Sequence, residues 1–118
     1  GWVVIFAAGI GNPFMTTDTA AALRATEVEA KVLLMAKHNV DGVYASDPNI
    51  DISASKIDAL TYRDVLDKRL QIMDTTAISL CMENNVPIIV FDLFVDGSLK
   101  RIIEGEKLGS IVHETSVR

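Results

Sequence analysis

Ten residues near the beginning of the chain, GIGNPFMTTD (residues 9–18), most constrain what the chain can fold into. They follow a continuous apolar run, residues 2–6, whose β-branched and aromatic side chains favour a strand that is covered on both faces. Thr16, Thr17 and Asp18 are good N-cap residues, and the alanine-rich segment behind them has high helix propensity. The stretch therefore predicts a strand, a glycine loop and a helix start.

The loop between this strand and this helix is a candidate phosphate site. Gly9 and Gly11 remove side chains where the chain must turn sharply or let a ligand approach its backbone. The free N–H groups at a helix start favour an anion such as phosphate. The alternative is a tight connection between strand and helix that binds no ligand, because short glycine motifs also match by chance.

Composition and charge limit the class of protein. The length of 118 residues suits one domain, and with 49% apolar and 23% charged residues the composition is globular. No apolar run is long enough to span a bilayer, and we see no targeting segment. A single cysteine, Cys81, permits no internal disulfide, so we expect a soluble cytoplasmic protein with no membrane partner.

The net charge of −5 argues against nucleic acid as a partner. No basic block is longer than a pair such as Lys100 and Arg101, whereas binding to a nucleic-acid backbone depends on clustered Lys and Arg. A single nucleotide remains possible, because backbone N–H groups and Mg²⁺ can bind its phosphates.

Further along the chain, strands and helices alternate. KVLLMAK (residues 31–37) is predicted to be a second buried strand, which would complete a right-handed unit of strand, helix and parallel strand. The loop that follows contains VDGVYASDP (residues 40–48) and leaves the carboxyl end of that strand, where ligands collect in open α/β sheets. Residues 87–94 are predicted to be another strand, and SIVHE (residues 110–114) a final short one.

Helix caps and one packed thiol are also predicted. Thr61 and Asp64 form an approximate capping box, Asp74 is a probable N-cap, and Ser98 is expected to cap a short helix. Cys81 falls at helical spacing with apolar neighbours, so we expect a core thiol. Residues 115–118 are expected to fray.

No common catalytic motif accounts for the polar residues of the loops. The sequence has no metal-ligand cluster of His, Cys and carboxylates, no GxSxG elbow and no GxxxxGK[ST] loop. Phosphoryl transfer needs positioned donors and Mg²⁺ more than a nucleophilic side chain, and loop-end polar residues would meet that need. The alternative is that each is only a cap or turn residue. The candidates are Asn12, Thr16, Thr17, Asp18, Asn39, Asp41, Tyr44, Asp47 and Asp74.

Four segments in order, GIGNPFMTTDTAAALRATEVEA, VDGVYASDP, LTYRDVLDKRLQIMDTTA and VPIIVFD, resemble the bacterial UMP kinases (uridylate kinases) of the amino-acid-kinase fold. The similarity covers almost the whole of this chain, but only the carboxyl-terminal half of the proteins of that family. We therefore expect residues 1–118 to form a single nucleotide-binding domain. The amino-terminal half, with another glycine loop and a lysine at the transferred phosphoryl group, is absent here. The resemblance implies an α/β fold with an open, mainly parallel sheet and helices on both faces.

The resemblance also implies an activity, the transfer of the γ-phosphoryl group of ATP to UMP with Mg²⁺ as cofactor. Asp18 would lie near the reacting phosphates as the catalytic carboxylate. Tyr44 would pack against adenine, and Asp47, Asp74 and a residue at or near Asn39 would contact ATP, although His38 or Lys37 could occupy the Asn39 position. The stretch that would bind UMP comprises Ile10, Gly11, Asn12, Pro13, Phe14, Met15, Thr16 and Thr17, with Ile10 where many family members have Thr.

Two further expectations follow from the family. Its members are usually hexamers regulated by GTP and UTP, so a homo-oligomer with these effectors is implied. Without the lysine and glycine loop of the other half, the isolated chain should not turn over at a normal rate. The remaining alternatives are a related phosphotransferase that acts on a carboxylate or carbamate, and a non-catalytic nucleotide-binding or assembly module.

Overall fold

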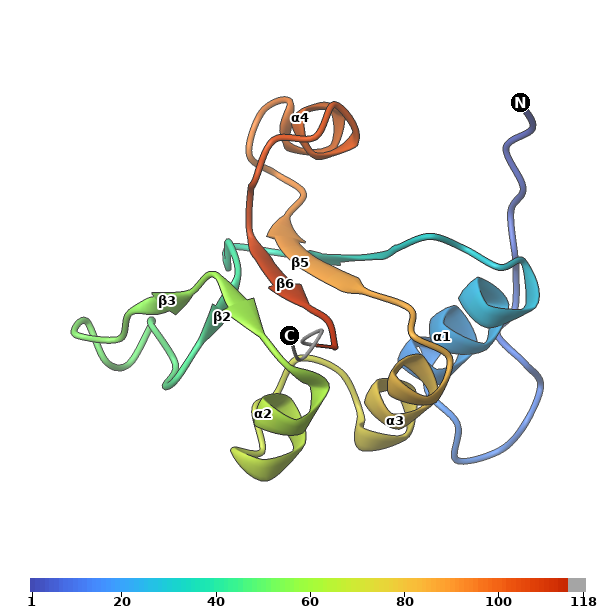
Figure 1. The fold of residues 1–118 in the computed structure, drawn as a ribbon, viewed down its shortest axis with the longest axis horizontal. Coiled ribbons are helices and arrows are strands. Elements are labelled where there is room, and N and C mark those ends of the chain that lie inside the picture. The colour runs from blue at the N-terminus through green and yellow to red at the C-terminus, as the bar shows by residue number, and fades with distance from the viewer. Residues whose placement is uncertain (115–118) are drawn as a thin grey trace.

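A four-stranded sheet organises the chain, and the computed structural model describes residues 1–114 of it (Figure 1). The strand order is β1 (Leu33–Lys37), β5 (Ile88–Asp92), β6 (Ser110–Val112) and β4 (Ala59–Leu60). The pairings β1–β5 and β4–β6 are parallel, whereas β5–β6 is antiparallel. A separate antiparallel pair joins β2 (Val43–Tyr44) to β3 (Lys56–Ile57). The predicted fraying of residues 115–118 lies outside the described residues.

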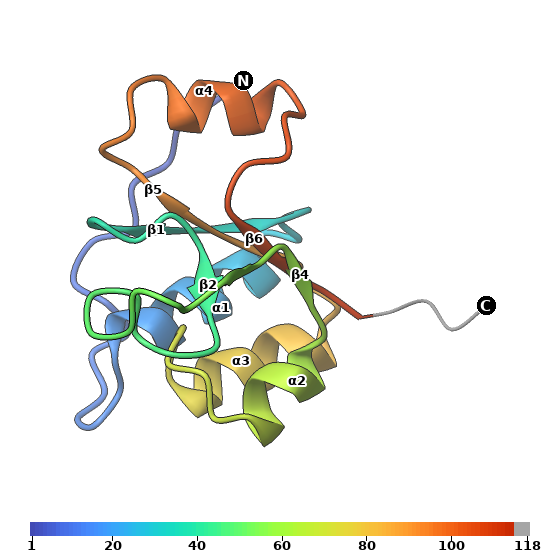
Figure 2. The same ribbon diagram turned by 90° about the vertical axis from the view of Figure 1, so that its left-hand side faces the viewer.

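Helices cover both faces of the larger sheet (Figure 2). Helices α1 (Thr17–Glu27), α2 (Tyr62–Asp67) and α3 (Thr75–Glu83) lie on one side, and α4 (Ser98–Ile103) lies on the other. Since two of the three pairings in this sheet are parallel, the predicted fold class is confirmed: an α/β fold with an open, mainly parallel sheet.

The core lies between β5 and the helices beneath it. Ile88 and Val90 of β5 and Ile78 of α3 are almost fully buried, and the hydroxyl of buried Tyr62 donates to the Val86 carbonyl at 2.6 Å. Cys81 has no exposed surface, so the predicted packed thiol is confirmed. Burial raises the pKa of this thiol to about 11, which keeps it protonated and unreactive at neutral pH.

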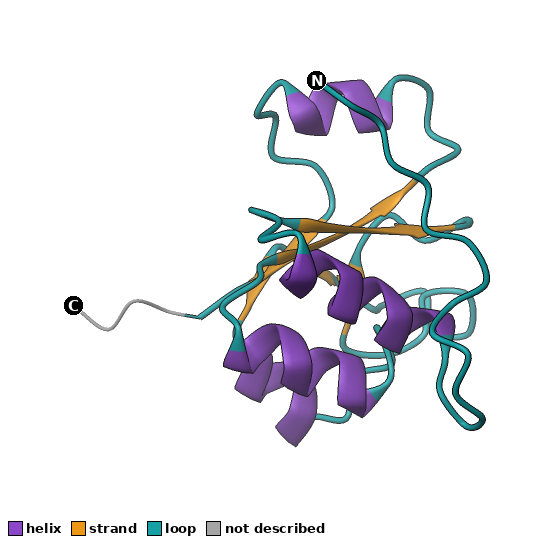
Figure 3. Cartoon of the chain, turned by 90° about the vertical axis from the view of Figure 1, so that its right-hand side faces the viewer, coloured by secondary structure: helices purple, strands orange, loops and turns teal. Residues whose placement is uncertain are grey.

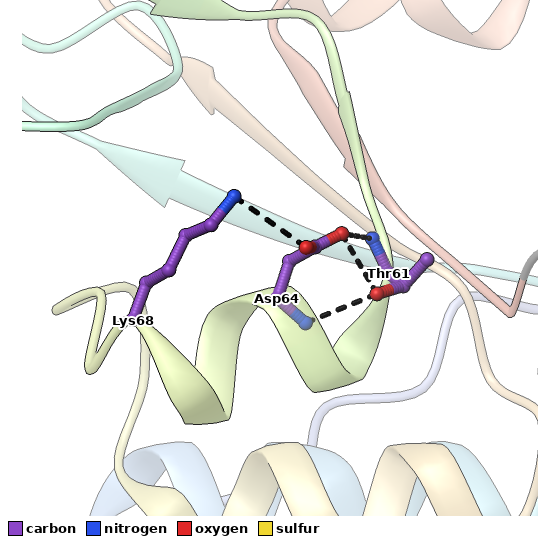
Figure 4. A network of polar contacts seen from close by, with 3 residues as sticks. All are labelled: Thr61, Asp64 and Lys68. Carbon is purple, nitrogen blue, oxygen red and sulfur yellow. Dashed lines mark hydrogen bonds and ion pairs between the residues drawn. The ribbon is translucent and has the colours of Figure 1, made fainter.

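The helix caps follow the sequence at three of four predicted sites, the first of which is Thr16 before α1. Thr61 and Asp64 form a complete capping box at the start of α2, and Lys68 lies 3.4 Å from the same carboxylate (Figure 4). Asp74 caps α3 through the Ala77 N–H. The Ser98 prediction is wrong: Ser98 is the first residue of α4, and its side chain is buried.

The reason lies one residue earlier in the chain. Gly97 occupies the cap position with a φ of 70°, and no side chain makes a cap hydrogen bond there. Glycine adopts this left-handed conformation at no steric cost, so the helix begins directly after it.

The predicted first strand is not formed. Residues 2–6 are drawn as a loop that runs along the outside of the molecule (Figure 3), and the exposed fractions of Trp2 and Ile5 are 97% and 87%. The predicted unit of strand, helix and parallel strand is therefore also wrong. An apolar run indicates burial, but a strand also needs a neighbour for its backbone hydrogen bonds, and no described strand pairs with the outer edge of β1.

Two smaller expectations shift as well. The second predicted strand begins two residues late, at Leu33, and the last one ends at Val112. Within residues 1–114, no helix is both long enough and apolar enough to cross a membrane.

Candidate functional site

One cavity, which we call the first cavity, lies at the carboxyl end of β1 and has a volume of about 430 Å³. One wall is the VDGVYASDP loop, from Val40 to Asn49, and the opposite wall is residues 68–72 after α2. Lys37, the last residue of β1, also lines it. The cavity therefore lies where the sequence predicted a ligand crevice, beyond the carboxyl end of a parallel strand.

Tyr44 is held in place on the wall of this cavity. Its hydroxyl donates to Asp41 Oδ1 at 2.6 Å, and Lys56 Nζ lies 3.5 Å from the other oxygen of that carboxylate. The hydrogen bond from Tyr44 lowers the pKa of Asp41 and raises the pKa of Tyr44. The result is a neutral phenol whose hydroxyl is hydrogen-bonded to Asp41.

The other residues predicted to contact ATP are placed unequally. Asp47 lines the cavity, and its Oδ1 accepts from the Asn49 backbone N–H at 2.9 Å, which makes it a turn residue as well. Asn39 is exposed, has a φ of 58° and does not line the cavity, whereas Lys37 does. Of the three residues considered for this position, the structure brings Lys37 to the cavity.

A second cavity, of about 820 Å³, adjoins the first at residues 69–72. Asp18 and Asp74 line it together with the end of α2 and the start of α3. Residues 69–72 line both cavities, and we call them the partition segment. The two cavities therefore share one wall, which is a segment of four consecutive residues.

The amino-terminal ends of α1 and α3 are joined beside this cavity. Thr16 caps α1 by accepting from Thr19 N–H, and its hydroxyl donates to the Asp74 carboxylate. Thr19 also donates to Asp74, at 3.2 Å, while the Asp74 backbone N–H donates to Asp18 Oδ2 at 3.2 Å. Each helix start therefore supplies a polar group to the other.

Asp74 is an anion inside this network. Burial raises its pKa, but hydrogen bonds from Thr16, the Ala77 N–H and Thr19 together outweigh that effect, so the pKa of Asp74 lies below its usual value. The carboxylate is therefore ionised at neutral pH and receives donors from both helices.

The glycine loop itself stands away from both cavities. Gly9 and Gly11 have positive φ angles, and the side chain of Phe14 is fully exposed. Among the residues expected to contact UMP, Thr16 reaches Asp74, whereas residues 10–15 and Thr17 line neither cavity. The loop is drawn projecting from the body of the molecule (Figure 3).

Sequence reasoning missed several residues that line the cavities or join the helices. Lys68, Arg69 and Gln71 follow a short helix and carry no motif of their own. Thr19 looked like part of an alanine-rich helix, although its position three residues after Thr16 matches the spacing that a cap uses. Among residues 1–114, no group of three or more His, Cys, Asp or Glu side chains could hold a metal ion.

The pKa of Asp74 leads to a prediction for Asp74→Asn. A carboxylate with a lowered folded pKa stabilises the fold above its unfolded pKa of about 4, and that stabilisation is lost as the pH falls through the lower folded value. The wild type should exceed the variant in unfolding free energy by about 1 kcal/mol at neutral pH, because hydrogen bonds to a charged carboxylate are stronger than those to the neutral amide oxygen of asparagine. The gap should close on acidification to about pH 2, as measured by urea denaturation. A gap that stays constant over this range would contradict the prediction.

Known proteins are similar to this chain in sequence and in fold. Residues 1–92 match the model of the amino acid kinase family. The chain is 38% identical to UMP kinase from Bacillus anthracis, with a TM-score of 0.89 over 92% of this chain and 44% of that one. It is 40% identical to UMP kinase from Ureaplasma parvum, with a TM-score of 0.84 over 90% of this chain and 45% of that one.

A third, more distant match is uridylate kinase from Archaeoglobus fulgidus, with 29% identity and a TM-score of 0.68 over 83% of this chain and 47% of that one. The chain spans less than half the length of each of these solved structures. Because the family model covers most of its residues and the described fold agrees, the chain belongs to the amino acid kinase family.

Proposed function

We propose that this chain is the carboxyl-terminal, nucleotide-binding half of a UMP kinase, which transfers the γ-phosphoryl group of ATP to UMP and releases UDP and ADP. The observation that carries the proposal is the partition segment, which gives two cavities one shared wall. A transfer between two bound substrates needs two adjoining sites whose reacting ends meet. The 38% and 40% identities to two UMP kinases support the choice of acceptor.

ATP would occupy the first cavity. Tyr44 offers its ring to the adenine, Asp47 offers a carboxylate, and Asp74 follows the partition segment on the wall of the second cavity. The contact expected at or near Asn39 would come from Lys37, because Asn39 does not line the cavity. Lys37, Lys68 and Arg69 add positive charge to the lining, which suits a chain of phosphates.

UMP would be held by residues 10–17, with Asn12, Thr16 and Thr17 as polar contacts and with the backbone at Ile10 in place of a hydroxyl. Asp18 follows this loop and lines the second cavity, and this position supports the proposal that its carboxylate acts on the reacting phosphates. The loop stands away from both cavities, so the proposal requires it to move toward Asp18 and Asp74 when UMP binds.

Mg²⁺ would accompany ATP. The carboxylate oxygens of Asp18 and Asp74 and the Thr16 hydroxyl are hard oxygen ligands, which fit a cation that is usually bound by one or two carboxylates together with substrate phosphates. When bound, it supplies positive charge that offsets the charge on the transferring group. A homo-oligomer, up to a hexamer, with GTP and UTP as effectors is part of the same proposal.

An acceptor assay tests the function. The full-length protein and this chain are each given ATP, Mg²⁺ and one acceptor, UMP, CMP or an amino acid, and ADP release is measured. We expect turnover of UMP by the full-length protein and little by this chain, because this chain lacks the other half's cationic groups. Turnover of an amino acid but not UMP would overturn the proposal, and nucleotide binding without any transfer would indicate a non-catalytic module.

Asp18→Asn tests the role of the carboxylate. Turnover of UMP in the full-length protein should fall by about 100-fold or more, as for other groups that act on developing charge. Stability should change by no more than about 1 kcal/mol, because asparagine keeps an oxygen that can accept the Asp74 N–H. Asp96→Asn, an exposed aspartate before α4, is the control and should keep wild-type turnover. Unchanged turnover in the Asp18 variant would leave Asp18 as a residue of the helix start alone.

Tyr44→Ala tests which cavity takes ATP. Loss of a ring that packs on a base weakens binding by about 1–3 kcal/mol, so the KM for ATP should rise about tenfold while that for UMP changes little. Tyr44→Phe keeps the ring and removes only the hydrogen bond to Asp41, and it should retain most of the ATP affinity. The opposite order of effects would mean that the two nucleotides occupy the cavities the other way round.

A further inference from the structure

Lys37 makes a contact that its place at the end of a strand does not explain. It is half-buried, and its ammonium group donates to the backbone carbonyl of Ile72 at 2.7 Å. Among residues 1–114 it forms no ion pair, whereas Lys68 on the same cavity lies 3.4 Å from Asp64. The Lys37 ammonium group therefore makes a charge-assisted hydrogen bond to one neutral carbonyl oxygen, and such bonds are stronger than those between neutral groups.

That oxygen belongs to the partition segment. Ile72 is its last residue and has only 4% of its surface exposed, and its own N–H turns back to Leu70 at 3.0 Å. Arg69, its first residue, has a φ of 51°, an uncommon conformation for a side chain of this size. A short segment with a tight turn and an unfavourable backbone angle needs contacts from outside to keep one conformation.

The segment leads directly to the joined helix starts. Asp74 is two residues beyond Ile72, and its N–H and carboxylate bond to Asp18 and Thr16. A shift of the Ile72 carbonyl would therefore move the backbone of Asp74 relative to α1. Lys37 lines only the first of the two cavities. The Ile72 carbonyl that it contacts, however, belongs to a residue that lines both.

We propose that Lys37 is a positioning residue that holds the partition segment in place and so links the two cavities. The kinetic part of this inference rests on the function proposed above. Its structural part, the restraint on residues 69–74, does not depend on which substrates bind. A residue that only contacted ATP would affect the first cavity alone, whereas a residue that holds the shared wall affects both.

Three variants of the full-length protein test the proposal. Lys37→Met removes the donor and keeps most of the apolar stem, and Lys37→Arg keeps a cation that can donate. Lys68→Met is the matched control, because it removes the same charge from the same cavity without touching the Ile72 carbonyl. Lys37→Gln, a milder change, replaces the methionine variant if that variant does not fold.

The first measurement is amide hydrogen exchange. Peptides that cover residues 69–75 should exchange several-fold faster in Lys37→Met than in the wild type, with the peptide of β5 as the reference for global stability. Lys68→Met should match the wild type, and Lys37→Arg should lie between the two. Equal exchange in Lys37→Met and the wild type would overturn the proposal.

The second measurement is steady-state kinetics well below the unfolding temperature. In Lys37→Met the KM values for ATP and for UMP should both rise about tenfold, the effect of losing one hydrogen bond to a charged group. A rise for ATP alone, or unchanged values for both, would overturn the proposal. If the wild type does not phosphorylate UMP, the proposed function fails, and the exchange experiment alone then decides the role of Lys37.

Discussion

The contact between the starts of α1 and α3 is the interaction on which the candidate site depends. Asp74 caps its own helix through the Ala77 N–H and also accepts from Thr16, the residue that caps the other helix. In the other direction, the Asp18 carboxylate accepts a hydrogen bond from the Asp74 backbone N–H. Two helix starts with their free N–H groups side by side would repel each other, and an ionised carboxylate between them removes that cost. The two helices can therefore pack together through small side chains such as Ala22 and Ala77.

This contact also explains why α1 keeps its place although the strand before it is not formed. The helix packs mainly against α3, so its position does not depend on a strand directly before it in the chain. The outer edge of β1 stays without a described partner, and the apolar residues 2–6 stay exposed. An exposed edge and an exposed apolar run are two unsatisfied surfaces of one fold, as expected where a chain spans less than half of the structures it resembles.

Local signals in the sequence predicted what depends on local chemistry. The capping box at Thr61, the cap at Asp74, the strand around Val90 and the packed Cys81 all follow from residues within one turn or one strand. The site was predicted in part, because Tyr44 and Asp47 do line a cavity. The ligand expected there, ATP, follows only from the family resemblance and stays a prediction, because spacing alone does not identify a ligand. The Lys37 bond to Ile72 joins residues 35 positions apart, and no pattern in the sequence marks that kind of contact.

The charges of the two cavities differ in a way that suits different parts of one reaction. The chain as a whole is acidic, with a net charge of −5, yet the first cavity has three cationic side chains, Lys37, Lys68 and Arg69, against the carboxylate of Asp47. A local positive surplus in an acidic protein concentrates anionic ligands at that point. The second cavity has Asp18 and Asp74 against Arg69 alone, so a phosphate could approach these carboxylates only with a cation between them. Under the proposed function, Mg²⁺ carried in with a polyphosphate in the first cavity would meet that requirement, and the carboxylates of the second cavity would then depend on the occupant of the first.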